Sequence, residues 1–376
     1  MKKVYCLLSV AFFMLCSCAD RPAEDITPPV QTEAAATPAS EAPADSFLDQ
    51  ISRMSLEEKA AQMFIARCPA DNAAELAAQY QLGGYILFAR DFKDSTPDKL
   101  RQTIQSYQKQ ANIPMLIGVD EEGGTVNRVS RYPQFRRMPF QSPQDVFAAG
   151  GMNAVYADAK EKAAFLSGLG INLNFAPVCD VSQNPADFIY ARAFGKDAEM
   201  TAEYVDNVVR GMREMHMGSV LKHFPGYGNN ADTHTGVVYD ERKYNQFEES
   251  DFLPFQAGID AGADMVLVSH NIVACMDAKY PACLSPKVHR ILREELGFGG
   301  VIITDDLVMD AIGQYTDDES ATVLAVQAGN DMLCCTNFTE QIPAVVRAVR
   351  EGKLEESRLE KSVLKILKLK KALGLL

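Results

Sequence analysis

Residues 301–306 have the sequence VIITDD, a run of β-branched apolar residues that ends in two carboxylates. A continuous apolar run of this kind is typical of a strand that is buried on both faces of a parallel sheet. Similar runs recur along the chain and give eight candidate strands, at residues 63–67, 83–89, 114–120, 171–178, 219–224, 264–270, 301–305 and 331–336. Stretches with helical spacing lie between them, at 56–63, 97–109, 153–169, 200–215 and 320–328, and two more follow at 341–351 and 358–372. The alternation predicts a parallel sheet covered by helices.

The number of strand–helix units predicts the architecture. Eight units in about 330 residues match a single (β/α)8 TIM barrel of the α/β class, with the surplus residues in long loops. A doubly wound open sheet is the alternative, but no Gly-rich phosphate-binding turn follows the first strand. The composition, 47% hydrophobic and 23% charged, is that of an ordinary globular protein.

Polar side chains gather at one end of the predicted strands. In parallel barrels the chemistry lies beyond the C-terminal ends of the strands. The candidate strands end in a carboxylate, an ammonium or an imidazole at five places: Asp120, Lys222 with His223, His270, Asp305 and Asp306. We therefore expect one functional site at this end of the barrel.

The N-terminal segment differs from the rest of the chain. Lys2 and Lys3 precede a short apolar run, so residues 1–17 are predicted to be a signal peptide. The sequence LCSC at 15–18 resembles a bacterial lipobox, which implies a lipid on Cys18; a plain cleaved secretory signal is the alternative. Residues 18–45 are rich in Ala, Pro, Glu and Thr and are predicted to form a disordered tether before a catalytic domain at 46–376. We expect a protein of the cell envelope, anchored to a membrane by lipid and facing away from the cytoplasm.

Charge and cysteine content restrict the possible partners. The formal net charge of −13 argues against binding to nucleic acid. Six cysteines follow Cys18, and they lack the CxxC spacing of zinc sites, so no metal is expected. Cys275 and Cys283 could pair outside the cell or remain free thiols.

Three segments carry candidate chemistry. The loop after the fifth strand contains KHFPGYG at 222–228 and then Asp232 and His234, where a carboxylate near an imidazole can raise its pKa toward that of a general acid. The alternative is an ordinary polar loop. Asp305 at a strand end can act as a nucleophile, although Asp is also favoured as a helix cap. The segment GVDEEGG at 118–124 places Asp120 eight residues before Arg128; a metal-binding loop or a solvated turn is the alternative.

Over residues 47–376, these motifs resemble the glycoside hydrolase family 3 β-N-acetylglucosaminidases, including those that recycle peptidoglycan. The resemblance implies that Asp305 is the nucleophile and that His234, paired with Asp232, is the acid/base. It also implies that the sugar is bound by Asp120, Arg128, Arg192, Lys222 and His223. The chain departs from the family at Tyr227, where a second histidine is common, and in a slightly shorter loop at 228–232. His270 has no implied role and is expected to line the pocket.

The expected function is that of a retaining exo-β-N-acetylglucosaminidase, acting on peptidoglycan fragments or chitooligosaccharides through a covalent glycosyl-enzyme and without a cofactor. A β-glucosidase or an N-acetylglucosaminide phosphorylase of the same family is an alternative. So is a catalytically inactive sugar-binding lipoprotein, or a Schiff-base aldolase that uses Lys222, which would leave Asp232 and His234 unexplained.

Overall fold

The computed structural model describes residues 44–231, 236–308, 310–313, 315–316 and 318–376. Residues 43–376 form one compact unit. Cys18, Asp232 and His234, to which the sequence assigns a lipid and the acid/base pair, lie outside the described residues. No helix among the described residues is both long enough and apolar enough to cross a membrane.

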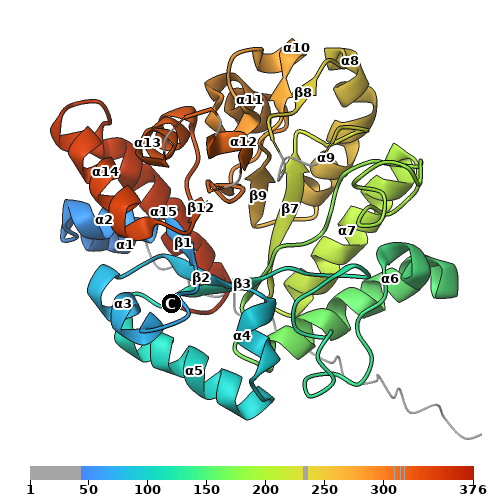
Figure 1. Cartoon of the computed structure of the whole chain (residues 1–376), viewed down its shortest axis with the longest axis horizontal. Coiled ribbons are helices and arrows are strands. Elements are labelled where there is room, and N and C mark those ends of the chain that lie inside the picture. Colours follow the sequence, from blue (N-terminus) through green and yellow to red (C-terminus); the bar gives the residue numbers. More distant parts are fainter. Residues whose placement is uncertain (1–43, 232–235, 309, 314, 317) are drawn as a thin grey trace, which may run out of the picture. The chain divides into compact units, whose positions relative to one another are not determined.

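Eight parallel strands form the centre of the fold (Figure 1). Their order is β11-β9-β7-β6-β3-β2-β1-β12. Ile303 of β11 also pairs in parallel with Met332, which directly precedes β12, so the two end strands meet and the sheet closes. The predicted (β/α)8 barrel is confirmed. Its strands are β1 (Phe64–Arg67), β2 (Gly84–Leu87), β3 (Leu116–Val119), β6 (Leu173–Asn174), β7 (Gly218–Phe224), β9 (Met265–Val268), β11 (Val301–Thr304) and β12 (Leu333–Cys335).

The fourth barrel strand is shorter than its apolar run predicts. Of residues 171–178, only Leu173–Asn174 form β6, and Val178 adds an isolated pairing with Lys222. Pro177 has no N–H to give to a ladder, and this limits how far the strand can extend. The other seven barrel strands match their predicted positions to within a few residues.

Helices surround the barrel. The predicted helical stretches correspond to α2, α5, α6, α7, α13, α14 and α15, and the structure adds shorter ones. The helices are α1 (Ala44–Ser52), α2 (Leu56–Gln62), α3 (Ala73–Tyr80), α4 (Ala89–Lys93), α5 (Pro97–Gln110), α6 (Pro143–Ser167), α7 (Ala198–Glu214), α8 (Tyr244–Gln246), α9 (Phe252–Asp260), α10 (Ala274–Asp277), α11 (Pro286–Arg290), α12 (Asp310–Gly313), α13 (Asp318–Ala328), α14 (Phe338–Arg350) and α15 (Glu356–Ala372). The short turns η2 (Phe247–Asp251), η3 (Ala282–Leu284) and η4 (Ile291–Glu295) extend this set.

The longest of these helices begins before the point that its periodicity indicates. α6 starts at Pro143, not at 153, and Ser142 caps its N-terminus by accepting from the Asp145 amide. Gly150 and Gly151 have non-helical backbone angles, so the element consists of two helices across a kink. The predicted stretch from 153 is the second of them.

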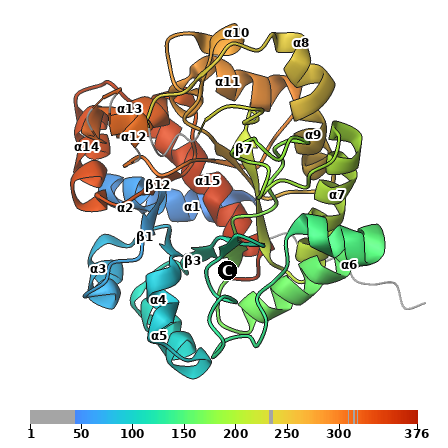
Figure 2. The same ribbon diagram turned by 45° about the vertical axis from the view of Figure 1, so that its right-hand side comes forward.

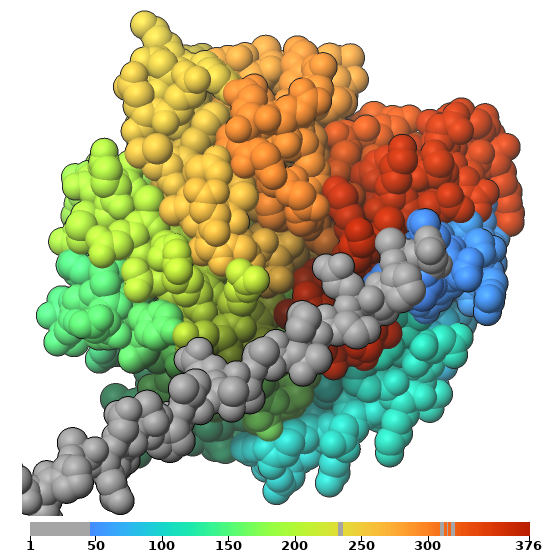
Figure 3. Space-filling view, turned by 180° about the vertical axis from the view of Figure 1, so that it is seen from behind, coloured from blue at the N-terminus to red at the C-terminus, as the bar shows by residue number. Residues whose placement is uncertain are grey.

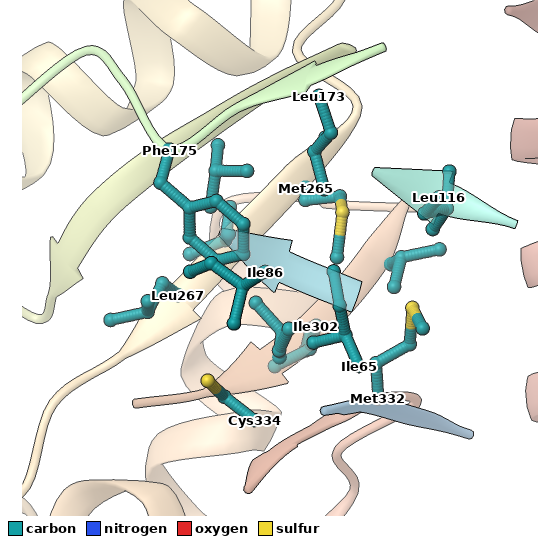
Figure 4. Packing of buried hydrophobic residues seen from close by; sticks show 14 of the residues in the cluster. Ile65, Ile86, Leu116, Leu173, Phe175, Met265, Leu267, Ile302, Met332 and Cys334 are labelled. Atoms are coloured by element: carbon teal, nitrogen blue, oxygen red, sulfur yellow. The ribbon is translucent and has the colours of Figure 1, made fainter. Parts of the chain in front are cut away.

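Large side chains fill the inside of the barrel, so it is a packed core and not a pore. Figure 4 shows the contributions of several strands meeting at the centre, and each labelled side chain is buried. The labelled residues are Ile65, Ile86, Leu116, Leu173, Phe175, Met265, Leu267, Ile302, Met332 and Cys334. This core fixes the positions of the strand ends, where the polar residues lie.

The first and last helices of the described chain pack together. α2 contacts α14 and α15, and α1 contacts α15. Figure 2 shows α1 beside α15, and Figure 3 shows the blue N-terminal and red C-terminal helices next to each other on the surface. Lys59 of α2 joins them by ion pairs of 2.8 Å to Glu356 and 2.6 Å to Glu360. These contacts hold the two ends of the barrel domain together.

Candidate active site

A cavity of about 350 Å³ lies at the C-terminal ends of the barrel strands. It is built by residues on or directly after each of the eight barrel strands, together with residues of the hairpin after β3 and of the loop that holds Arg192. Its lining includes six of the residues that the sequence singles out: Asp120, Arg128, Arg192, Lys222, His223 and Asp305. The structure therefore brings them into one site, while their roles in substrate binding and catalysis stay predictions.

Lys222 of β7 bridges two carboxylates in this cavity. Its Nζ lies 2.7 Å from Asp120 Oδ1 and 2.6 Å from Glu122 Oε1. The Lys222 side chain is 2% exposed, that of Asp120 is 16% exposed and that of Glu122 is 2% exposed. Asp120 directly follows β3, and Glu122 lies on the short strand β4 (Glu121–Gly123), which pairs with β5 (Val126–Asn127). An ammonium with two carboxylates is a fixed hydrogen-bonding unit at the wall of the cavity.

Arg192 completes this cluster. Its Nε and Nη2 donate to the two Glu122 oxygens at 3.0 and 2.8 Å, which is the bidentate arrangement that binds a guanidinium most firmly. Burial by itself would raise the pKa of Glu122, but the charges of Arg192 and Lys222 outweigh it and hold that pKa well below its usual range. Burial would likewise lower the pKa of Arg192, and Glu122 keeps it above its usual range. Glu122 is therefore ionised at any physiological pH.

The contacts of His223 fix its tautomer. Arg192 Nη2 lies 3.1 Å from His223 Nε2, and a guanidinium can only donate, so Nε2 accepts. The proton of the neutral ring then lies on Nδ1, which donates to Asp180 Oδ2 at 2.7 Å. Asp180 also accepts from the backbone amides of His223 at 3.2 Å and Tyr227 at 2.7 Å. Asp180 thus holds both the ring and the start of the loop after β7.

Asp305 and Asp306 follow β11 and both line the cavity. The backbone amide of Asp306 donates to Asp305 Oδ1 at 2.8 Å. The Asp306 side chain accepts from the Val308 amide at 3.2 Å and forms an ion pair of 3.1 Å with Arg67 of β1. Burial raises the pKa of Asp306, and the Val308 amide and Arg67 oppose that shift. The second aspartate is therefore a structural partner, and its amide orients the carboxylate of the first.

A neighbouring glutamate positions Arg128. Glu121, the residue between Asp120 and Glu122, is fully buried, and its carboxylate accepts from the backbone amides of Arg128, Val129 and Ser130 at 2.8 to 3.1 Å. Arg128 Nε consequently lies 4.0 Å from Asp120 Oδ2 at the cavity wall. The acidic run at 120–122 is neither a metal-binding loop nor a solvated turn in this structure, because each carboxylate is held by cations or amides.

Phe88, next to β2, also lines the cavity, beside two arginines. The Arg67 guanidinium carbon lies 4.4 Å from the centre of the Phe88 ring, and that of Arg128 lies 5.8 Å from it. All three residues line the cavity. The site consequently combines hydrogen-bonding ions with an aromatic face, which suits a sugar with polar and apolar edges.

The expectation that His270 lines the pocket is wrong. It follows β9 but is fully buried behind the cavity, with Nε2 3.0 Å from the Asp306 carbonyl and Nδ1 3.1 Å from Cys283 Sγ. The chain continues past Val268 into packed structure, so the His270 side chain contacts the backbone of Asp306 and does not line the cavity. Cys283 is a buried free thiol and Cys275 an exposed one, so the open question of their pairing is answered in favour of free thiols.

At Tyr227, where the chain departs from the family pattern, the side chain is buried. Its ring lies 5.3 Å from that of His223 in an edge-on arrangement. At this position of the chain, therefore, a tyrosine packs against the His223 ring.

Sequence reasoning missed Glu122, Asp180 and Arg67. Glu122 lies two residues after Asp120, within the acidic segment that the sequence singles out. The neighbouring sequence does not show, however, that Glu122 contacts Arg192 while Glu121 accepts from backbone amides. Asp180 lies two residues after a predicted strand and Arg67 ends another, a signal that could have included them. Their partners, His223 and Asp306, are 43 and 239 residues away along the chain.

Comparison with known proteins decides the family. The sequence profile described as "Glycosyl hydrolase family 3 N terminal domain" matches residues 55–369. The chain belongs to glycosyl hydrolase family 3. As a member of this family it is an enzyme, a glycoside hydrolase.

Relatives in this family include curated proteins with the name beta-hexosaminidase. The one from Nitrosomonas eutropha is 32% identical over 295 residues, which are 75% of this chain and 83% of that protein. The one from Methylococcus capsulatus is 34% identical over 271 residues, 71% of this chain and 79% of that protein. A solved structure of a family 3 β-N-acetylglucosaminidase from Paenibacillus sp. has a TM-score of 0.80 at 30% identity, over 86% of this chain and 63% of that one.

Proposed function

We propose that this family 3 member is a retaining exo-β-N-acetylglucosaminidase with Asp305 as its nucleophile. The observation that carries the proposal is the cavity at the C-terminal strand ends, which is lined both by Asp305 and by the ionic cluster of Asp120, Glu122, Arg192, Lys222 and His223. The choice of N-acetylglucosamine rests on the relatives named beta-hexosaminidase and on the Asp232–His234 pair in the sequence.

The reaction proceeds in two steps. In the first, the Asp305 carboxylate attacks the anomeric carbon, the bond to the departing oxygen breaks, and protonated His234 gives that oxygen its proton. In the second, neutral His234 takes a proton from water, whose oxygen attacks the anomeric carbon and releases the Asp305 carboxylate. Asp232 stabilises the imidazolium between the steps, as an aspartate does in a hydrolase triad. The configuration at the anomeric carbon is retained because it is inverted twice.

The ionic cluster supplies selectivity for the sugar. Asp120 accepts hydrogen bonds from hydroxyls, while Arg192, Lys222 and Arg128 donate to oxygens of the ring substituents. Since the charges of Glu122 and Asp180 fix the donors beforehand, little reorganisation is needed when the sugar enters. A sugar without the matching hydroxyl leaves buried ions unpaired and is rejected strongly.

Features of the N-terminal sequence support a substrate outside the cytoplasm. The signal-like segment 1–17, the lipobox-like LCSC ending at Cys18 and the polar stretch 18–45 support a lipoprotein held at a membrane of the cell envelope. Peptidoglycan fragments, in which N-acetylglucosamine precedes N-acetylmuramic acid, are then the substrate class within reach. Chitooligosaccharides share the same terminal sugar.

The test is release of nitrophenol from 4-nitrophenyl N-acetyl-β-D-glucosaminide, with the 4-nitrophenyl β-glucoside and a phosphate titration in parallel. We expect release from the first substrate, independent of phosphate, and loss of at least three orders of magnitude in Asp305→Asn. Asp306→Asn is the matched variant and should retain more activity, since that side chain holds Arg67. Activity on the glucoside alone, or acceleration by phosphate, would replace the proposal with a glucosidase or a phosphorylase. Unchanged turnover in Asp305→Asn would remove the nucleophile assignment.

A further inference from the structure

A groove at the other end of the barrel carries a strong excess of positive charge. It has a volume of about 890 Å³ and lies between α15 and the segment formed by α11 and η4. Asp331 and Gly299, which line it, precede β12 and β11 in the chain, so the groove lies at the N-terminal ends of the strands. It is therefore a site separate from the catalytic cavity. Its ionised lining consists of two carboxylates, Glu294 and Asp331, and six cations: Arg290, Arg293, Arg358, Lys361, Lys365 and Lys368.

The spacing of the cations gives the groove a continuous basic wall. Residues 358, 361, 365 and 368 of α15 are separated by three or four positions, so they share one face of the helix. Arg290 and Arg293 project from the facing segment. In a chain whose formal net charge is −13, such a concentration opposes the overall charge of the protein.

One buried carboxylate forms ion pairs with three of these cations. Asp331, whose side chain is 2% exposed, forms ion pairs with Arg293, with Arg358 at 3.5 Å and with Lys365 at 3.3 Å. Burial lowers the pKa of Lys365, and although Asp331 opposes this, the neighbouring Arg293 and Arg358 lower it further. A single negative charge does not balance three cations, so this part of the groove favours an additional anion.

The remaining three cations are exposed. Arg290, Lys361 and Lys368 form no ion pair with any carboxylate in the described part of the chain. Their side chains are exposed to solvent beside the three cations that pair with Asp331. They would contribute to binding an anion without first breaking an internal contact.

The groove lies next to the helix through which the N-terminal segment enters the domain. Leu364 lines the groove and also packs with the cluster that contains Ile51 of α1 and Val363 and Leu367 of α15. Lys371, one turn further along α15, lies over the ring of Phe47 of α1 at 5.9 Å. Leu48 of the same helix is 51% exposed, although large apolar side chains are usually covered. Basic and apolar groups are thus combined beside the start of α1.

We propose that this groove docks the domain on the phosphate headgroups of an anionic membrane surface. The inference rests on the proposed lipid anchor for proximity: only 25 residues lie between Cys18 and Ala44 in the sequence, so a lipid on Cys18 keeps the domain close to the headgroups. Each basic side chain near an anionic bilayer adds to the attraction. Since the catalytic cavity lies at the opposite ends of the strands, docking in this way directs it away from the lipid, toward the glycan.

The test uses the chain from Ala19 to Leu376, which carries no lipid, in sedimentation with vesicles of phosphatidylglycerol and phosphatidylcholine or of phosphatidylcholine alone. We expect binding to the anionic vesicles at low salt and its loss at about 0.5 M salt, where exposed charges are screened. Replacing Arg290, Lys361 and Lys368 by Gln should weaken binding about fivefold for each residue, or roughly a hundredfold together. The matched control replaces the exposed Lys99, Lys109 and Lys196 by Gln and should bind nearly as the unmodified chain does.

Each outcome of these experiments either supports or contradicts docking on an anionic membrane. If the unmodified chain does not bind anionic vesicles, or if both triple variants lose binding equally, the docking groove is wrong. If inorganic pyrophosphate raises the unfolding midpoint while vesicles do not bind, the groove serves a soluble phosphate and the lipid assignment is overturned. Nitrophenol release is measured on the same variants and should be unchanged in all of them. Loss of hydrolysis with vesicle binding intact would count against the proposed reaction, not against docking.

Discussion

Glu122 is the carboxylate that compensates the positive charges of Arg192 and Lys222 in the cavity. It accepts two hydrogen bonds from Arg192 and one contact of 2.6 Å from Lys222, and its side chain is 2% exposed. Without its charge, Lys222 would keep only its contact with Asp120, and Arg192 would lose its bidentate contact with a carboxylate. Removing one partner of a buried ionic cluster lowers the stability of the fold strongly, because the remaining charge is left without compensation. Replacing the whole cluster by apolar residues would change the stability much less.

We predict that Glu122→Gln lowers the free energy of unfolding by about 3–5 kcal/mol and raises KM for the nitrophenyl substrate. Urea denaturation and steady-state kinetics measure the two effects. Glu57→Gln is the control, since Glu57 forms an exposed pair with Arg350 and should change stability by about 1 kcal/mol or less. Equal losses in the two variants would contradict the central place of Glu122.

The same residue predicts a pH dependence. The pKa of Glu122 is held below its usual range in the fold, so the unfolded chain takes up a proton first on acidification. The stabilisation is complete above the unfolded pKa of about 4.3 and is lost as the pH falls toward the folded value. The difference in unfolding free energy between the unmodified chain and Glu122→Gln should therefore shrink below about pH 4. A difference that stays constant from pH 7 to pH 3 is the contrary result.

At the scale of the element, the loop after β7 depends on one glycine. Gly226 has φ +124, and a Cβ there would lie 2.1 Å from Asp251 Oδ1. Asp251 cannot easily move, because Arg242 donates to both of its oxygens at 2.9 and 3.0 Å. The segment that leads toward Asp232 and His234 is thus fixed against η2.

We predict that Gly226→Ala displaces this loop and lowers kcat/KM about a hundredfold, since a shift of about 1 Å at a catalytic group has an effect of that size. Gly299→Ala is the matched control, because no atom lies within 4 Å of the added Cβ and its φ is not in the left-handed region. Kinetics on both variants provide the measurement. Activity of Gly226→Ala close to that of Gly299→Ala would show that the loop tolerates the shift.

The helix pair α2 and α15 contains a buried lysine. Lys370 is 0% exposed, and its Nζ donates to Gln62 Oε1 at 2.8 Å. Burial lowers its pKa to about 7. The unfolded chain, with a lysine pKa of about 10.4, therefore binds more protons between pH 7 and 10, and the fold gains stability as the pH rises through this window.

We predict that Lys370→Met abolishes this rise and stabilises the fold at pH 7 by about 1 kcal/mol or more, because it removes a charge that must be buried. Unfolding free energies from pH 6 to pH 10 provide the measurement. Lys361→Met on the exposed face of the same helix should leave the pH profile unchanged. If the unfolding free energy rises with pH equally in Lys370→Met and in the unmodified chain, groups other than Lys370 cause the rise.

At the scale of the whole molecule, closure of the barrel holds the site together. The lining of the cavity includes side chains from β1, β3, β7 and β11. β12 lies between β11 and β1: Met332, next to β12, pairs with Ile303 of β11, and β12 pairs with β1. Arg67 and Asp306, 239 residues apart, can form an ion pair only in the closed sheet. The packing of α1 and α2 on α15 supports the closure from outside.

We predict that a chain beginning at Ala44 keeps the unfolding midpoint and the kcat/KM of the longer chain, because residues 43–376 form a compact unit by themselves. A chain that begins at Ser55 lacks α1 and exposes Ile51's partners Val363 and Leu367 on α15, so its midpoint should fall. Thermal unfolding of the two chains provides the comparison. A large loss of stability on removal of residues 1–43 alone would mean that the segment takes part in the fold.

The sequence by itself determined the barrel and most of the candidate site. Apolar runs buried on both faces can be recognised locally, and their polar last residues must meet once the strands are parallel, so Asp120, Lys222 and Asp305 could be placed together without a structure. Only the tertiary structure decided which neighbours serve which role. Glu121 holds backbone amides while Glu122 binds Arg192, and His270 turns behind the cavity while His223 faces it. These differences arise from contacts between residues far apart in the chain, whose partners no local pattern identifies.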